Sequence, residues 1–211
     1  MATLLPPQSR ARAVNPKHVL FAVAGMMTLF VLYYSERFLL DPTHPAWEHF
    51  AKVRWWLLPH GLGGALALFL GPLQFSTRFR QRHLRWHRIA GRLYVAGVLV
   101  AAPVSLYIVV IQGPPQVISA GFVQAGGWLL TTAAALVSVL RGNIQQHRQW
   151  MVRSYSVTFI FVATRVLLAI PAVERSGDEG AIQVFWICIA LAFLLPDFFV
   201  NWRAIWAARK S

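Results

Sequence analysis

The sequence is poor in charged residues, and in acidic residues above all, and it has a single cysteine. Only 13% of its 211 residues are charged, and Asp and Glu together number 7, whereas about 25% charged residues is usual for a soluble domain. A soluble fold of this size cannot bury a chain that is 57% hydrophobic, but a lipid bilayer solvates such a surface. The lone Cys188 has no disulfide partner in the chain, and we interpret it as a small apolar residue.

The charge that is present is basic: 20 Lys and Arg give a formal net charge of +13. In a soluble protein this excess would suggest nucleic-acid binding. Here the basic residues lie between apolar runs, so we expect no nucleic-acid partner and interpret them as determinants of membrane orientation. We predict contact with anionic lipid headgroups for the densest segment, which contains Arg78, Arg80, Arg82, Arg85, Arg88 and Arg92.

Six apolar segments are long enough to cross the hydrocarbon core, which takes about 20 helical residues. Strands with open edges are not satisfied in lipid, so the spans are expected to be helices. The sequence therefore predicts an all-α, six-helix transmembrane bundle over residues 18–206, between tails 1–17 and 207–211. The expected helices are 18–40, 55–76, 88–111, 119–140, 150–171 and 181–202.

The connections between these segments alternate in charge. Six of the seven acidic residues fall on one side, and most basic residues fall on the other. The positive-inside rule then places both termini in the cytoplasm, as expected for a multi-pass protein of the bacterial inner membrane. The cytoplasmic side has Arg10, Arg12 and Lys17, the arginines of segment 78–92, Arg141, Arg148, Arg203, Arg209 and Lys210, and the outer side has only Arg37, Lys52, Arg54 and Arg175.

Small residues recur four positions apart in the second expected helix, as Gly61/Ala65 and Ala67/Gly71. In lipid, such spacing lets two helix backbones approach closely. The fourth helix is similarly rich in small residues between Gly121 and Gly127. We expect these residues to serve tight helix packing and not ligand binding.

Ionisable residues inside the membrane are functional candidates, because their burial in lipid is costly. Asp197 is the only acid on the cytoplasmic side, and Arg153 is its expected partner. An outer layer contains His60 and Arg165 at similar depth, with Arg165 expected to be the deepest charge and to face the bundle interior or a wet cavity. The inner layer is expected to contain Gln74, His87, Arg88, Arg92, Tyr94, His147, Arg148, Arg153, Tyr155 and Asp197.

Histidines at equal depth on facing helices are the pattern of a b-type haem site, and His87 and His147 meet the depth condition. The alternative is that both are interfacial residues that bond headgroups or Asp197. A three-histidine zinc site with His83 is disfavoured because the neighbouring arginines repel a cation, so we predict no metal site. The candidate cofactor-binding residues are His60, His87, His147 and Arg165, and the candidate polar network is Gln74, Arg92, Arg153 and Asp197.

Arg165 has two interpretations that the sequence leaves open. It is either a structural arginine that bonds helix carbonyls or an anchor for an anionic or carbonyl-bearing ligand such as a quinone. The chain has no phosphate-binding glycine loop, no Ser-His-Asp arrangement with an identifiable acid and no cysteine pair. The sequence therefore does not decide whether the protein is an enzyme.

Taken in order, the motifs resemble a bacterial family of predicted membrane proteins with a domain of unknown function, number 2306. The resemblance covers about residues 57–170 and implies a membrane protein without an assigned activity. It rests on His60-Gly61, on Gly71-Pro72-Leu73-Gln74-Phe75, on His87-Arg88 with Gly91-Arg92-Leu93-Tyr94, on His147-Arg148-Gln149-Trp150-Met151 with Arg153-Ser154-Tyr155, and on Arg165.

Three hypotheses for function follow. The first is a redox or binding protein that holds a haem or a quinone through its intramembrane His and Arg residues. The second is a small transporter or lipid-interacting protein in which the same groups line a polar path. The third is a structural or assembly subunit in which these groups satisfy one another.

Overall fold

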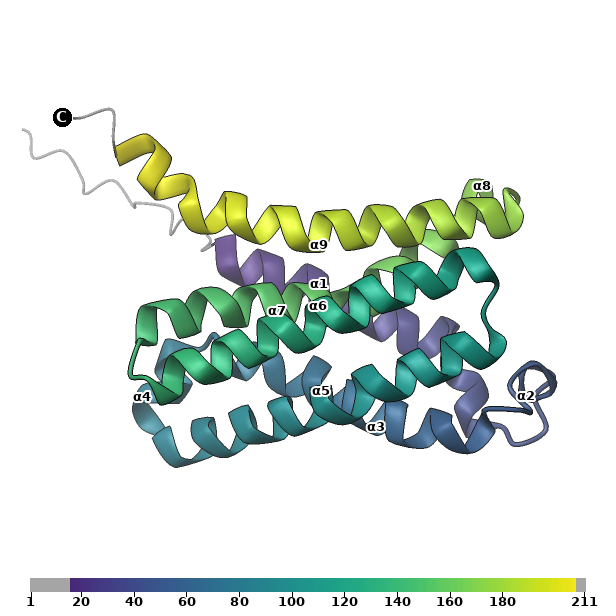
Figure 1. The fold of residues 1–211 in the computed structure, drawn as a ribbon, viewed down its shortest axis with the longest axis horizontal. Coiled ribbons are helices and arrows are strands. Elements are labelled where there is room, and N and C mark those ends of the chain that lie inside the picture. The colour runs from purple at the N-terminus through teal and green to yellow at the C-terminus, as the bar shows by residue number, and fades with distance from the viewer. Residues whose placement is uncertain (1–15, 208–211) are drawn as a thin grey trace, which may run out of the picture.

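The computed structural model describes residues 16–207, and these residues form helices joined by turns, without a strand (Figure 1). The basic residues Arg10, Arg12, Arg209 and Lys210 of the two expected tails lie outside this range. For Lys17 and Arg203 the structure describes the backbone but not the side chain. The elements are α1 (Pro16–Tyr34), the 3-10 helix η1 (Arg37–Leu40), α2 (Ala46–His49), α3 (Arg54–Gln74), α4 (Thr77–Arg82), α5 (Leu84–Gln112), α6 (Pro115–Leu140), α7 (Ile144–Leu168), α8 (Pro171–Glu174) and α9 (Gly177–Ala207).

Five helices within residues 16–207 are long and apolar enough to cross a membrane, namely α3, α5, α6, α7 and α9. The remaining long helix, α1, has a shorter described apolar stretch, Val19–Tyr34. The prediction of an all-α protein with several membrane-spanning helices is confirmed.

Among the helix boundaries that differ from the expected ones, two have a clear local reason. The first helix ends at Tyr34 instead of residue 40, because the N–H groups of Ser35 and Glu36 both bond the Val31 carbonyl and the chain turns there. The fifth expected helix starts at Ile144 instead of residue 150, because the Asn143 side chain caps it by accepting the Gln146 N–H at 3.1 Å.

The long helices form a bundle around α7. Helix α3 packs on α5, α5 on α6, α6 on α7, and α7 on α3, which places α5 and α7 on one diagonal. Helix α9 covers α6 and α7, and α1 packs on α7 as well. Figure 1 shows α4 and the C-terminal end of α9 at one end of the bundle and α2 and α8 at the other; these are called the α4 end and the α2 end below.

The backbones of α3 and α5 touch where two glycines cross. A Cβ added to Gly63 would lie 2.6 Å from the carbonyl oxygen of Gly97, and one added to Gly97 would lie 2.5 Å from that of Gly63. Gly63, Ala67 and Gly71 are the buried small residues of α3, four positions apart. The predicted Ala67/Gly71 pair is therefore confirmed, but Gly61/Ala65 is wrong: Gly61 is exposed, and a Cβ there would meet nothing within 4 Å.

In α6, only part of the glycine-rich segment serves packing. A Cβ on Gly127 would overlap the ring of Phe193, so this glycine lets α9 lie close to α6. A Cβ on Gly126 would meet nothing within 4 Å. The small residues of α6 thus act at specific positions and not as a continuous stripe.

Gly63→Ala is expected to destabilise the bundle by about 1–3 kcal/mol, because the added methyl group must push two helix backbones apart. The measurement is thermal unfolding of the detergent-solubilised protein. Gly64→Ala is the matched control, since a Cβ at Gly64 meets nothing within 4 Å and Ala favours the helix. Equal melting temperatures for the two variants would contradict the close contact.

Candidate functional site

Three consecutive residues of α7 each contact a different neighbour. Successive helical residues point about 100° apart, because a turn contains about 3.6 residues. Arg153 bonds α9, Ser154 bonds α5 and α6, and Tyr155 bonds α3. The sequence Arg-Ser-Tyr is therefore explained by the central position of α7.

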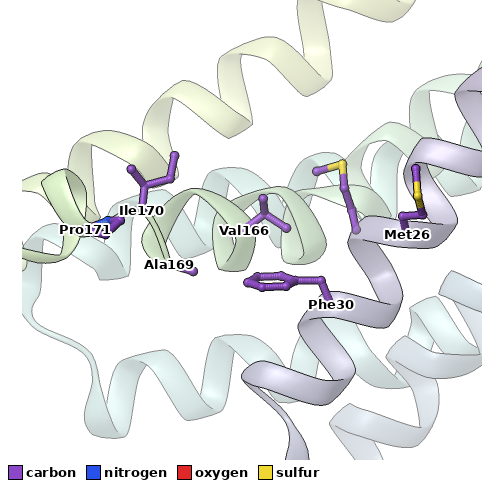
Figure 2. Close-up of a pocket in the computed structure, with 7 residues that line it drawn as sticks. Met26, Phe30, Val166, Ala169, Ile170 and Pro171 are labelled. Carbon is purple, nitrogen blue, oxygen red and sulfur yellow. The ribbon is translucent and has the colours of Figure 1, made fainter.

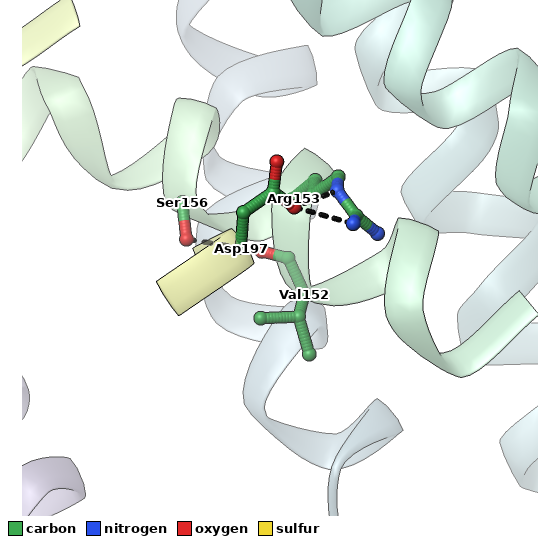
Figure 3. Close-up of polar contacts among 4 residues, drawn as sticks. All are labelled: Val152, Arg153, Ser156 and Asp197. Atoms are coloured by element: carbon green, nitrogen blue, oxygen red, sulfur yellow. Dashed lines mark hydrogen bonds and ion pairs between the residues drawn. The ribbon is translucent and has the colours of Figure 1, made fainter. Parts of the chain in front are cut away.

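Arg153 forms the ion pair that the sequence predicts. Its Nε donates to Oδ1 of Asp197 at 2.7 Å, and a terminal guanidinium nitrogen contacts the same oxygen (Figure 3). The guanidinium also lies over the ring of Trp150, 4.7 Å from its centroid. Because the Asp197 side chain is 52% exposed, this pair joins α7 to α9 at the bundle surface and is not part of a buried centre.

A fully buried cluster of hydroxyl groups joins α5, α6 and α7. The Tyr94 hydroxyl lies 2.7 Å from Ser154 Oγ and 2.9 Å from Thr158 Oγ1. Ser154 Oγ lies 2.7 Å from Thr132 Oγ1. Trp128 closes the cluster, since its Nε1 donates to Thr158 at 3.0 Å and its carbonyl accepts from Thr132 at 2.7 Å.

The donor in most of these contacts follows from the Trp128 carbonyl. This carbonyl can only accept, so Thr132 donates its hydrogen there, and the hydrogen between Ser154 and Thr132 must come from Ser154. Tyr94 then donates to Ser154. The single hydroxyl hydrogen of Thr158 has two acceptors within reach, the Tyr94 oxygen at 2.9 Å and the Ser154 carbonyl at 3.1 Å. Such a buried network is costly to break in part.

The Tyr155 hydroxyl replaces a backbone hydrogen bond that α3 lacks. Pro72 lacks an N–H, so the carbonyl four residues earlier, that of Leu68, loses its helical partner. The Tyr155 hydroxyl donates to that carbonyl at 3.2 Å. Gly71 leaves the necessary room, because a Cβ there would overlap the Tyr155 ring. Gly71-Pro72 and Tyr155 are therefore two halves of one contact.

The inner histidines lie at the α4 end, His87 on α5 and His147 on α7. His147 Nδ1 donates to the Ala135 carbonyl at 2.9 Å, which leaves a lone pair on Nε2. His87 Nδ1 is buried and has no hydrogen-bond partner among the described residues. The two rings interact electrostatically, and Gln74 Nε2 lies 3.5 Å from the His87 carbonyl.

Other members of the expected inner layer are exposed or paired elsewhere. Arg92, expected in the polar network, is exposed on α5, and so is Arg88. Asp197 pairs with Arg153 and not with either histidine. Residues 16–207 contain no group of three or more His, Cys, Asp or Glu that could hold a metal ion.

At the other end, His60 Nδ1 lies 3.0 Å from the Ala101 carbonyl of α5. Because a carbonyl only accepts, this ring has the same tautomer as His147, with a free lone pair on Nε2. The charge of Arg165 acts on the His60 ring.

Arg165 is nearer the helix end than the sequence suggests. Because α7 ends at Leu168, Arg165 lies in its last turn, and the Arg165 side chain is 41% exposed. Its Nε lies 3.4 Å from Oε1 of Glu36, which is only 14% exposed. Burial raises the pKa of Glu36, and the Arg165 charge partly offsets this rise. The expectation that Arg165 is the deepest charge is therefore corrected.

Two cavities lie near the C-terminal end of α7. A polar one of about 120 Å³ is lined by Tyr34, Ser35, Arg165, Leu168, Ala169 and Glu174. An apolar groove of about 400 Å³ lies between α1 and α7 and is lined by Met26, Met27, Phe30, Val166, Ala169, Ile170 and Pro171 (Figure 2). Ala169 lines both, so the groove and the polar cavity are neighbours.

Sequence reasoning missed Glu36 as the partner of Arg165, and it missed Thr132 and Thr158 in the hydroxyl chain. Glu36 lies two residues past the end of α1, where a partner for the end of α7 can be sought. Thr158 lies one turn after Ser154 and shares its face. For Thr132 no local signal exists, because its partner is on another helix.

The fold and these contacts define a polytopic α-helical membrane protein with a polar core around one central helix. The chain belongs to the family described as predicted membrane protein (DUF2306), which matches residues 57–201. The match extends beyond the stretch that carries the motif resemblance and includes Asp197. Neither the curated proteins nor the solved structures compared with the chain include a match.

Proposed function

We propose that the protein binds a bilayer-soluble amphiphile of the quinone class at the α2 end of α7. The polar head lies beside Arg165, and the apolar tail lies in the groove between α1 and α7. The observation that carries this proposal is that an apolar groove and a polar cavity are neighbours, both lined by Ala169. Ligand sites are commonly apolar clefts of about 300–1,000 Å³ with a few placed polar groups.

The charges of the polar cavity favour a neutral head over an anionic one. Arg165 is balanced by Glu36 and faces a second acid, Glu174, in the same cavity. An anion would meet two acids and one base. A quinone carbonyl instead accepts a hydrogen bond from the guanidinium without adding charge.

Glu36 supplies the complementary acceptor. Its Oε1 is buried without a hydrogen-bond partner among the described residues, although it lies 3.4 Å from Arg165 Nε. A buried acceptor of this kind is costly unless a donor reaches it. The hydroxyl group of a quinol meets this need, so one site serves both redox forms of such a ligand.

The groove suits a flexible apolar tail. Met26 and Met27 adapt their shape to a neighbouring chain, as unbranched methionines do, and Phe30 lines the same wall (Figure 2). Met26 is 63% exposed, so the groove is open to the surrounding lipid. A haem, the other cofactor that the sequence suggests, would use different residues at the α4 end.

Arg165→Met is expected to weaken binding of decylubiquinone at least tenfold, about 1.4 kcal/mol, because the carbonyl loses its donor. The measurement is a saturation titration of the detergent-solubilised protein, followed by tryptophan fluorescence. Arg37→Met is the matched control, since Arg37 is an exposed arginine of the same end.

An unchanged affinity in Arg165→Met would contradict the proposed site, as would a titration of the native protein that does not saturate. Arg165→Lys separates charge from geometry, because lysine keeps the charge and loses the planar fork of donors.

We further propose six membrane spans with both termini in the cytoplasm of a bacterial cell. The segment 78–92 lies at the α4 end together with the turn between α6 and α7 and the C-terminal end of α9 (Figure 1). Helix α1 has the apolar composition of a span, and starting it on the cytoplasmic side completes the alternation. The arginines of segment 78–92 then contact anionic headgroups of the inner leaflet.

In a Cys188→Ala background, Ser176→Cys is expected to react with a membrane-impermeant maleimide on intact spheroplasts, and Gln81→Cys only after permeabilisation. A tag at the N-terminus should also be protected until then. Protease access to that tag in intact spheroplasts would show that α1 does not span.

Replacing Arg78, Arg80, Arg82 and Arg85 with Gln should reduce the anionic phospholipid that co-purifies, while Arg37→Gln should not.

A further inference from the structure

A second site lies at the α4 end, and it is independent of the quinone site. We infer that His87 and His147 are the two axial ligands of a haem of the b type, held between the diagonal helices α5 and α7. The placement of the two rings, the hydrogen bond of His147 and the charges nearby support this site.

The positions of the two histidines follow from the contact between Tyr94 and Ser154 in the hydroxyl cluster. His87 lies seven residues before Tyr94 on α5, and His147 lies seven residues before Ser154 on α7. Seven residues are about two helical turns, so each histidine shares the face of its hydroxyl partner. Tyr94 and Ser154 meet across the bundle at 2.7 Å. The two imidazoles therefore face each other at equal depth, about 10 Å nearer the α4 end.

The separation of the helices suits a cofactor. Helices α5 and α7 occupy a diagonal of the arrangement α3–α5–α6–α7, and diagonal helices are farther apart than adjacent ones. At the level of the hydroxyl cluster, the Tyr94 side chain spans the distance from α5 to α7 and reaches Ser154. Cofactor sites in helix bundles are built from side chains of facing helices in this way.

His147 makes the hydrogen bond that is usual for an axial ligand, whereas His87 lacks the corresponding bond. An imidazole that binds a metal through Nε2 normally donates its Nδ1–H to a carbonyl, and His147 does so to Ala135 at 2.9 Å. His87 Nδ1 is buried without a hydrogen-bond partner among residues 16–207. Binding of iron through Nε2 of His87 does not involve this nitrogen, so the hydrogen bonds support His147 alone as a prepared ligand.

The charges select a porphyrin over a bare ion. Arg80 and Arg88 act electrostatically on His87, and they repel a free cation. No third His, Cys, Asp or Glu joins the pair within the described residues, so a bare ion would have two protein ligands. A porphyrin supplies four nitrogens of its own, and its two propionates pair with arginines.

The test is the visible spectrum of the full-length protein, purified in detergent after expression with the haem precursor 5-aminolevulinate and then titrated with hemin. We expect a saturable Soret band and, after dithionite, the sharp α band of a six-coordinate low-spin haem. His87→Ala and His147→Ala should each convert the spectrum to high-spin or lose the haem. His83→Ala, which alters an exposed histidine four residues away, should leave it unchanged.

His147→Gly with added imidazole distinguishes ligation from folding. The free base should restore the low-spin spectrum of a folded variant, which a structural role would not do. Absence of a saturable Soret band in the native protein overturns the inference, and so does an unchanged spectrum in both alanine variants. Because decylubiquinone binding uses Arg165, it is unaffected by these variants, and the two proposals fail separately.

Discussion

The structure depends on the surrounded position of α7. Helices α1, α3, α6 and α9 all pack on it, so polar side chains on any of its faces meet protein or lipid instead of water. Lipid offers no hydrogen-bond partners, and each polar group must find one inside the bundle. Arg153, Ser154 and Tyr155 do this with three different neighbours. Residues 153–155 of α7 therefore join this helix to its neighbours.

The same constraint explains why small residues and prolines occur beside these contacts. Hydrophobic burial does not drive helices together in lipid, so close packing and hydrogen bonds must hold them. Gly63 and Gly97 let the α3 and α5 backbones touch. Pro72 frees a carbonyl that Tyr155 then binds. Where the polar groups are not fully satisfied, at Glu36 and His87, the proposed ligands lie at opposite ends of the bundle.

A contact could be predicted from the sequence where only one partner of the right charge was available. Asp197 was the only acid of its side, so its pairing with Arg153 could be predicted. Reasoning failed where the answer depended on a boundary or on a distant partner. Helix α7 starts six residues earlier than expected, after the cap at Asn143, and ends three residues earlier, at Leu168, so Arg165 lies in its last turn. Spacing alone did not reveal whether Gly61 or Gly63 faces α5, and Thr132 has its partner on another helix.

The central claim is that hydroxyl groups buried between α5, α6 and α7 hold the bundle together. A double-mutant cycle of Tyr94→Phe and Ser154→Ala, measured by unfolding in detergent, tests it most directly. The account predicts a coupling free energy of about 1 kcal/mol. It predicts none between Tyr94→Phe and Ser156→Ala, because Ser156 bonds a carbonyl of its own helix, that of Val152, at 3.0 Å. Equal coupling in the two cycles would contradict the account.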